Sequence, residues 1–200
     1  MKDITILENF INDEELEEAR QFIGEESLNL DKPSINRNWV FNEVDNAHKK
    51  ILVDLRPEER EWAFDMENII PSAKKFILKI KNRIDKCTNT NFDLHRVYLN
   101  RRVCGQDGVL HTDDQTLNAY TLLIYINDIT PENCDNVGGD LEFKNKENTR
   151  IEPVTKRAVL FKGYIPHKPY GPLVQGMTRI SMAFKIIDTA NELPFFVNYT

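Results

Sequence analysis

The chain has 200 residues, with 26 Lys and Arg against 32 Asp and Glu, so its formal net charge is −6. This length fits one globular domain with its own core, and the acidic balance argues against a general binder of nucleic-acid phosphates. No apolar run approaches the roughly 20 residues of a membrane span, and the first residues lack the pattern of a signal peptide.

The first predicted element is a helix over residues 12–23. Asn12 can cap its start, and Glu15 stands three positions later, which completes a capping box. Apolar residues then recur at helical spacing from Leu16 to Phe22. Local signals therefore place a helix close to the start of the chain.

Two further helices are predicted over residues 57–70 and 71–86. Each begins with a proline, which suits the first turn of a helix. The second combines an apolar face with a basic one, and we expect the basic face to lie in solvent. These helices are expected to support the rest of the chain.

Residues 29–50 show no sustained periodicity and are rich in asparagine, so they predict a long loop and a candidate lid. Its apolar cluster, Trp39 to Phe41, either pins the loop to the core or contacts a substrate. His48 lies in the same segment, and we assign it no role. The loop is the part of the sequence most open to interpretation.

From residue 92 onwards the pattern changes to strands. We predict strands over residues 92–103, 119–126, 140–143, 150–154, 157–161 and 177–187, of which the fourth and fifth form a possible hairpin. Many short strands in succession predict a barrel or a jelly roll. The whole chain, 1–200, is then one domain, with helical support in 1–90 and a β core in 91–187.

The tripeptide HTD places His111 and Asp113 two residues apart, so on a strand their side chains leave the same face. A neutral imidazole with a carboxylate suits divalent iron. The alternative is a surface turn after Gly108. His167 stands in a proline-rich segment and is either a loop residue or a further ligand.

Arg179 stands in the middle of an apolar strand, where an arginine is unusual. Ser181 shares its face by the two-residue period. A buried guanidinium needs an anion. The partner is either an internal Asp or Glu, or a ligand carboxylate held by two parallel hydrogen bonds.

Six segments over residues 92–187 resemble, in order, the Fe(II)- and 2-oxoglutarate-dependent oxygenases, in particular their prolyl-4-hydroxylase-like branch. They are HTD at 111–113, TLLIYIN at 121–127, VGGDLEF at 137–143, RIEPVTKRAVLF at 150–161, IPH at 165–167 and GMTRIS at 176–181. The resemblance implies a mainly β fold with N-terminal support helices, in which the core is a double-stranded β-helix (jelly roll).

The resemblance also implies roles for individual residues. His111, Asp113 and His167 would be the catalytic iron ligands, and 2-oxoglutarate and O2 would fill the remaining positions of the metal. Arg179 would bind the distal carboxylate of 2-oxoglutarate. Assisting roles fall to Tyr125 and Ser181, whereas Tyr98 would face the co-substrate or the substrate. The carboxylate of Asp113 favours hydroxylation over halogenation.

The expected reaction hydroxylates a peptidyl proline, an amino acid or another small substrate, and 2-oxoglutarate is decarboxylated to succinate and CO2. Ascorbate is a candidate reductant. The partner is then a small molecule or peptide, with no nucleic acid and no membrane, and the sequence predicts no oligomeric state. Three cysteines without CxxC spacing predict neither disulfides nor a zinc site, which fits a cytoplasmic protein.

Two alternatives remain. One is a non-catalytic jelly-roll binding module without iron. The other is a nucleic-acid demethylase of the same superfamily, in which a second arginine follows the co-substrate arginine by six residues. Lys185 stands at that position here, and the chain is acidic, so this alternative ranks lower. His95 is interpreted as structural.

Overall fold

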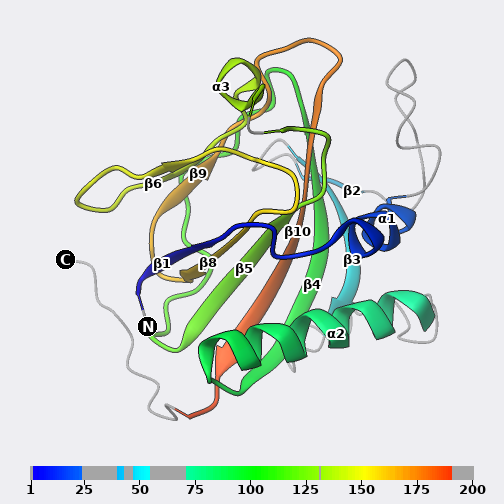
Figure 1. The fold of residues 1–200 in the computed structure, drawn as a ribbon. Coiled ribbons are helices and arrows are strands. Elements are labelled where there is room, and N and C mark those ends of the chain that lie inside the picture. Colours follow the sequence, from blue (N-terminus) through cyan, green and yellow to red (C-terminus); the bar gives the residue numbers. More distant parts are fainter. Residues whose placement is uncertain (1, 24–39, 43–46, 55–70, 131, 191–200) are drawn as a thin grey trace.

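The computed structural model describes residues 2–23, 40–42, 47–54, 71–130 and 132–190, with the backbone alone for 40–42, 47–54, 71–72 and 135. Over these residues two antiparallel sheets face each other, and helices cover the outer face of the larger sheet (Figure 1). This layering leaves one face of the larger sheet to the helices and the other to the smaller sheet.

The larger sheet has seven strands. In spatial order they are β1 (Ile4–Leu7), β8 (Ala158–Lys162), β5 (Ala119–Tyr125), β10 (Thr178–Asp188), β4 (Phe92–Val103), β3 (Ala47–Asp54) and β2 (Val40–Asn42). The smaller sheet is ordered β7 (Arg150–Ile151), β6 (Leu141–Phe143) and β9 (His167–Pro169). All neighbouring pairs are antiparallel.

The helices are α1 (Asp13–Gln21), α2 (Pro71–Thr88) and the short α3 (Cys134–Val137). The predicted capping box of α1 is confirmed, because the backbone N–H of Glu15 donates to Asn12 Oδ1 at 2.9 Å and that of Asn12 donates to Glu15 Oε2 at 3.0 Å. The predicted helix over 71–86 is confirmed as α2. The helix predicted over 57–70 lies outside the described residues.

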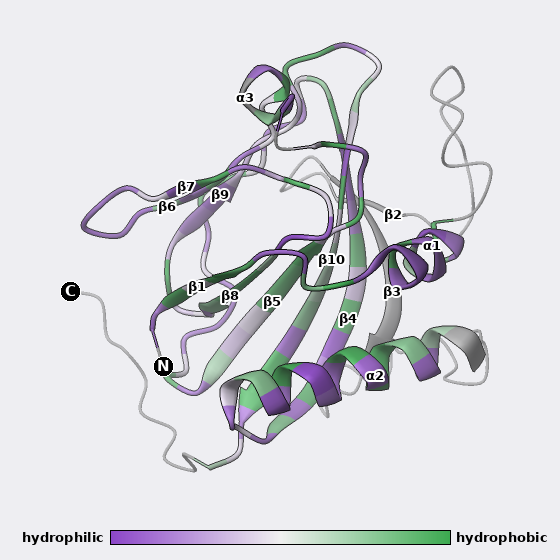
Figure 2. Ribbon diagram, in the orientation of Figure 1, coloured by the Kyte–Doolittle hydropathy of each residue, from purple (hydrophilic) through white to green (hydrophobic). Residues whose placement is uncertain are grey.

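The helix-covered face of the sheet forms the main apolar core. Alternate residues of β4, β5 and β10 meet the inner faces of α1 and α2 there, and Figure 2 shows α2 alternating between apolar and polar residues. The strand members of this cluster include Val97, Leu99, Leu122, Ile124, Ile180, Met182 and Phe184, and the helix members include Leu16, Phe76, Ile77, Ile80 and Ile84. The predicted jelly-roll class, mainly β with supporting helices, is confirmed.

Two strand predictions are wrong in detail. Segments 150–154 and 157–161 do not form a hairpin, because β7 pairs with β6 in the smaller sheet whereas β8 pairs with β5 and β1 in the larger one. The chain crosses between the sheets at this point, with Lys156 at a positive φ of 67°. β8 therefore pairs with strands that are remote in sequence, whereas β7 pairs locally with β6, and local patterns do not reveal this crossing.

The first half of the chain contains strands that we did not predict. It contributes β1, β2 and β3, and both β2 and the start of β3 fall within the predicted loop 29–50. β1 and β2 are the two edge strands of the larger sheet, and edge strands are often short. β3 lies between β2 and β4. Residues 24–39 and 43–46 lie outside the described part, so the lid prediction and Trp39 are not tested.

Candidate metal centre

A cavity lies between the two sheets, on the side of the larger sheet that faces away from the helices. Polar and charged side chains dominate its lining, which is unusual for the inside of a jelly roll. The lining residues are Tyr98, Asn100, Arg102, His111, Asp113, Thr121, Leu123, Leu141, Phe161, His167, Pro169, Arg179, Ser181, Ala183 and Lys185.

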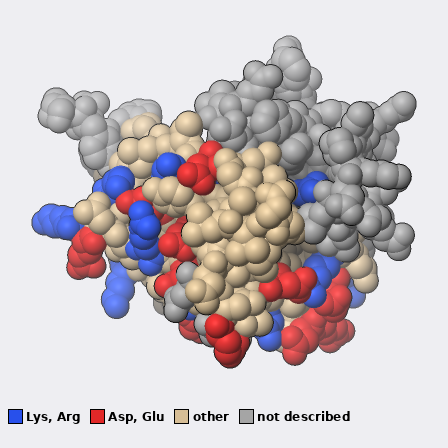
Figure 3. All heavy atoms as spheres, turned by 90° about the horizontal axis from the view of Figure 1, so that it is seen from above, with Lys and Arg blue, Asp and Glu red and all other residues tan. Residues whose placement is uncertain are grey.

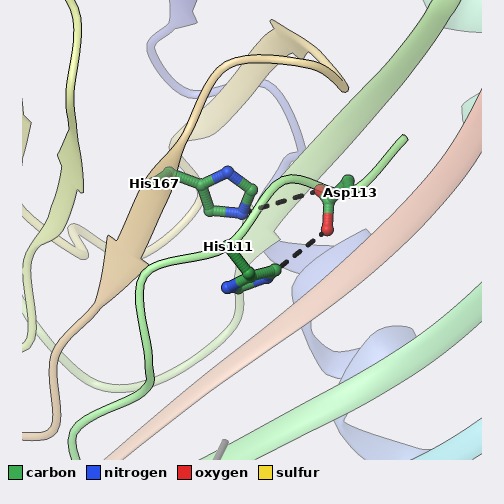
Figure 4. A group of neighbouring side chains, drawn as sticks. All are labelled: His111, Asp113 and His167. Atoms are coloured by element: carbon green, nitrogen blue, oxygen red, sulfur yellow. Dashed lines mark ion pairs between the residues drawn. The ribbon is translucent and has the colours of Figure 1, made fainter. Parts of the chain in front are cut away.

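Backbone contacts bring the three predicted metal ligands together. His111 and His167 form an isolated antiparallel bridge with N···O distances of 3.0 and 2.9 Å, and the N–H of Asp113 donates to the carbonyl of Gly163 at 2.8 Å. The carboxylate lies 3.5 Å from His111 Nε2 and 3.6 Å from His167 Nε2 (Figure 4). One possible ligand atom from each residue lies within 4.8 Å of the other two.

The HTD segment is not a regular strand, so strand alternation is not what brings His111 and Asp113 together. His111 alone takes part in a bridge, and Asp113 lies in a bend. Gly163 allows the close approach, since a Cβ at that position would lie 3.0 Å from the Cβ of Asp114. The alternative of a surface turn is also wrong, because only 8% of the Asp113 side chain is exposed.

Hydrogen bonds fix the tautomers of both histidines. Nδ1 of His111 lies 3.0 Å from the carbonyl oxygen of Val109, and Nδ1 of His167 lies 2.9 Å from that of Ile165. A carbonyl oxygen can only accept, so Nδ1 carries the proton in each ring. In the neutral form of each ring, Nε2 then has a lone pair that can bind a metal on the side of Asp113.

The charge states of these groups also suit a metal. Burial lowers the pKa of His167 to about 4, so its ring is neutral at physiological pH. Burial by itself raises the pKa of Asp113, but neighbouring groups, chiefly the charge of Lys185, outweigh it and hold that pKa well below its usual range. The hydrogen bond to Asp113 raises the pKa of His111, which favours its protonated ring, so a bound metal would take the place of that proton on Nε2. A carboxylate and a neutral imidazole are the forms that bind a divalent cation.

Arg179 lies deep in the cavity, with only 1% of its surface exposed. Its Nη2 donates to the hydroxyl of Tyr125 at 3.5 Å, and its guanidinium carbon lies 5.1 Å from the centroid of that ring. Its Nε has no hydrogen-bond partner, and no described Asp or Glu forms an ion pair with it. The alternative of an internal acidic partner therefore fails for the part of the chain that the structure describes.

Two more predicted residues lie around the same guanidinium. Ser181 follows Arg179 on the same face, is fully buried, and has an Oγ without a hydrogen-bond partner among the described residues. Burial raises the pKa of Tyr125, so its hydroxyl stays protonated and can donate. An orphaned N–H of an arginine beside an orphaned hydroxyl fits the carboxylate of a ligand. Tyr98 also lines the cavity, nearer to Lys185.

Sequence reasoning missed Lys185, Thr121 and Arg102 as parts of this cavity. Lys185 forms a close ion pair with Asp113, and Thr121 Oγ1 donates to the same carboxylate at 2.6 Å. The signal for Lys185 was present, because the two-residue period that links Arg179 to Ser181 continues to it along β10. His95, by contrast, lies opposite a bulge between Lys185 and Ile186, outside the cavity lining.

No protein-family model matches the chain, and no curated protein sequence matches it either. Solved structures do. A prolyl hydroxylase from Trichoplax adhaerens, in complex with a hypoxia inducible factor peptide fragment, aligns over 94% of this chain and 84% of its own, with a TM-score of 0.62 and 18% identity. A Pseudomonas putida prolyl-4-hydroxylase aligns over 93% and 92%, with a TM-score of 0.62 and 12% identity.

A third similar structure contains a metal and a keto acid. HygX from Streptomyces hygroscopicus, with nickel and 2-oxoglutarate bound, aligns over 99% of this chain and 92% of its own, with a TM-score of 0.59 and 12% identity. The chain thus has the fold of the Fe(II)- and 2-oxoglutarate-dependent oxygenases, and its two histidines and one aspartate converge as a metal-binding triad.

Proposed function

We propose that this protein is an Fe(II)- and 2-oxoglutarate-dependent dioxygenase that hydroxylates a peptidyl proline, an amino acid or another small substrate. The observation that carries the proposal is the pairing of two sites in one cavity. The Nε2 lone pairs of His111 and His167 converge with Asp113, and Arg179 lies on the same cavity wall without an acidic partner among the described residues.

The triad fits Fe(II) by its donor types, since two histidines and one carboxylate leave the other positions of the metal open. Bound iron supplies a centre at which a 2-keto acid and O2 bind together and O2 is activated. The protein's part is to present neutral imidazoles and an ionised carboxylate in fixed orientations. The rings of Phe161 and Phe143, with centroids 4.8 and 5.8 Å from that of His167, pack around one ligand and keep it in place.

The wall formed by Arg179, Ser181 and Tyr125 fits the distal carboxylate of 2-oxoglutarate. In the proposed arrangement the guanidinium neutralises that carboxylate, and the two hydroxyls donate to it. Arg179 Nε and Ser181 Oγ would then gain the partners that they lack within the described residues. Anchoring one end of the keto acid here orients its other end toward the triad.

The overall reaction consumes 2-oxoglutarate and O2 and gives succinate and CO2, with one oxygen atom entering succinate and the other the hydroxylated substrate. Asp113 completes the ligand set, so no position is left for a halide in its place, and we propose hydroxylation. Ascorbate is proposed as a reductant that returns the iron to the ferrous state. We also propose that the reaction takes place in the cytoplasm.

The surface around the cavity supports an uncharged peptide or small molecule as substrate. Val109 and Leu110, directly before His111, are exposed, as are Leu173 and Val174 in the neighbouring loop. Figure 3 views the molecule from the end that carries α3, and the centre of its described surface is largely uncharged, with charges of both signs at the margins. We therefore propose no nucleic-acid partner.

Among the described helices, none is both long and apolar enough to cross a membrane.

A metal-free binding module of the same fold is the competing proposal. A binding module without a metal does not explain two histidines that converge on a buried carboxylate, nor a buried arginine whose Nε lacks a partner among the described residues. Buried unsatisfied polar groups destabilise a fold, so their retention in one cavity favours a ligand-binding role for them.

The test is a turnover assay with Fe(II), 2-oxoglutarate and panels of peptides and free amino acids, in which succinate is measured. We expect substrate-stimulated succinate release that is lost in His111→Ala, Asp113→Ala and His167→Ala. Asp114→Ala is the matched control, because that carboxylate caps a turn by accepting from the N–H and hydroxyl of Thr116. Succinate release that survives Asp113→Ala would refute the proposal.

A further inference from the structure

Lys185 and Thr121 form a polar pair beside the triad. They lie directly opposite each other on β10 and β5, so their side chains leave the same face of the sheet. Lys185 Nζ donates to Thr121 Oγ1 at 2.9 Å, and Thr121 Oγ1 donates to Asp113 Oδ2 at 2.6 Å. Lys185 Nζ also pairs closely with that same oxygen.

Both contacts end on one oxygen of the carboxylate. An ionised carboxylate oxygen has about two lone-pair positions, and on Oδ2 the ammonium and the hydroxyl occupy both. Oδ1 receives neither contact and lies 3.5 Å from His111 Nε2, whereas Oδ2, besides these two contacts, lies 3.6 Å from His167 Nε2. The two oxygens of Asp113 are therefore not equivalent, since one is held by the protein and the other is available to a metal.

We infer that Lys185, with Thr121, is a positioning residue that makes Asp113 a one-oxygen metal ligand. The inference rests on the proposed function and deepens it. Two histidines and one carboxylate oxygen take three positions of a six-coordinate metal and leave three, two for the keto acid and one for O2. A carboxylate bound through both oxygens would leave only two, too few for both.

The surroundings of Lys185 argue against a direct role in binding substrate. The ammonium has three donors, and two of them are engaged by Asp113 and Thr121. Its Nζ also lies 5.7 Å from the ring centroid of Tyr98, which covers another side. An ammonium group held in this way orients Asp113 and Thr121 and has few donors left for a hydrogen bond to a substrate.

The experiment uses metals that need no oxygen-free handling. Calorimetry would measure the affinity of the purified protein for Ni(II) alone, and then the affinity of the Ni(II)-loaded protein for 2-oxoglutarate. The visible absorption of the Co(II)-loaded protein would report its coordination number. Lys185→Met removes the ammonium and keeps an unbranched apolar chain. Thr121→Val removes the hydroxyl at nearly equal volume, and Lys185→Arg tests rescue.

A control variant separates this role from the general loss of a sheet lysine. Lys162 on β8 is also partly buried, donates to the carbonyl of Leu117 at 2.9 Å and lies 4.2 Å from the ring centroid of Tyr120, outside the cavity lining. Lys162→Met should therefore leave both affinities and the Co(II) spectrum as in the wild type.

For Lys185→Met we expect Ni(II) affinity at least equal to that of the wild type, an altered Co(II) spectrum, and 2-oxoglutarate affinity reduced about 10-fold, within the range known for residues that orient metal ligands. Thr121→Val should also reduce 2-oxoglutarate affinity, but by a smaller factor, and Lys185→Arg should keep most of the wild-type affinity.

Unchanged 2-oxoglutarate affinity in both Lys185→Met and Thr121→Val would overturn the inference. A loss of Ni(II) affinity that parallels the loss of 2-oxoglutarate affinity would also overturn it. A wild-type protein that binds neither Ni(II) nor 2-oxoglutarate would instead overturn the proposed function.

Discussion

The two faces of β4, β5 and β10 differ sharply although the same strands supply both. On the helix-covered face, alternate residues such as Leu99, Ile124 and Met182 are apolar and fully packed. On the cavity face the intervening residues include Arg179 and Ser181, both buried. One face is built for stability, and the other keeps polar groups whose partners must come from outside the chain.

This difference separates residues that hold the fold from residues that serve the site. Burial of apolar surface stabilises the helix-covered face, whereas orphaned polar atoms on the cavity face destabilise it until a ligand binds. Substitutions on the two faces should therefore have opposite profiles. Substitutions on the helix-covered face should lower the free energy of unfolding and leave ligand affinity unchanged. Substitutions on the cavity face should weaken ligand binding without lowering the free energy of unfolding.

The largest stability effect is expected on the helix-covered face. Phe184 is 1% exposed and belongs to the cluster that meets α2. Phe184→Ala should lower the free energy of unfolding by about 3–5 kcal/mol, because it leaves a cavity in a packed core. Urea unfolding measures this loss. The folded variant should bind Ni(II) as the wild type does. A loss of Ni(II) binding in the folded variant would contradict the separation of stability and ligand binding between the two faces.

Arg179→Met should show the opposite profile. We expect 2-oxoglutarate binding to weaken by about 2–5 kcal/mol, since a buried carboxylate would lose its charged partner. The free energy of unfolding should stay constant or rise, because an unpaired buried cation is removed. Calorimetry and urea unfolding measure the two quantities. Equal 2-oxoglutarate affinity in the variant and the wild type would show that Arg179 does not bind this ligand.

Arg101 provides the matched control for that experiment. It is a neighbouring buried arginine on β4 that is outside the cavity lining, and burial lowers its pKa. Arg101→Met should leave 2-oxoglutarate affinity unchanged. A loss equal to that of Arg179→Met would mean that the measurement reports general damage to the sheet.

Glu15 is a buried carboxylate on α1 that forms ion pairs with cationic side chains of the protein itself. It pairs with Arg83 and Lys79, and the hydrogen bond from Arg83 is the main cause that lowers its pKa from 4.5 to about 2. Its contribution to stability is present above about pH 4.5 and is lost as the pH falls toward 2. Glu15→Gln should lower the free energy of unfolding at pH 7 by about 1–3 kcal/mol.

The pH dependence makes that prediction specific. Unfolding measured between pH 7 and pH 3 should show a shallower acid destabilisation in Glu15→Gln than in the wild type, because the variant has no proton to gain at this position. Identical slopes would show that the Glu15 pair does not contribute to acid sensitivity.

The smallest effect is expected at Ser181. Removing its hydroxyl should weaken 2-oxoglutarate binding by about 1 kcal/mol, the usual contribution of one neutral hydrogen bond, and should leave unfolding unchanged. Calorimetry with Ser181→Ala measures this. A loss as large as that of Arg179→Met would require a more central role for the hydroxyl than the geometry gives it.

Local patterns in the sequence predicted much of this arrangement. The capping box at Asn12 and the apolar periodicity of residues 92–103 and 119–126 are properties of neighbouring residues, and they specified α1, β4 and β5 closely. The motif order predicted that His111 and Asp113 would meet His167, which is far from them in the chain.

Features that depend on tertiary contacts were missed. The position of Asp113 follows from its contact with Gly163 and not from strand alternation. β1 pairs with β8 across most of the chain, and no local signal marks so short an edge strand. The contact between Lys185 and Asp113 joins β10 to a loop, so strand alternation alone does not reveal it.

The most direct test of the central claim is an anaerobic titration of the protein with Fe(II) and then 2-oxoglutarate, followed by visible absorption. The account predicts a weak charge-transfer band that saturates at one equivalent per chain and is absent in His167→Ala. A folded wild-type protein that develops no such band at saturating Fe(II) and 2-oxoglutarate would contradict the claim that this cavity binds iron and the keto acid together.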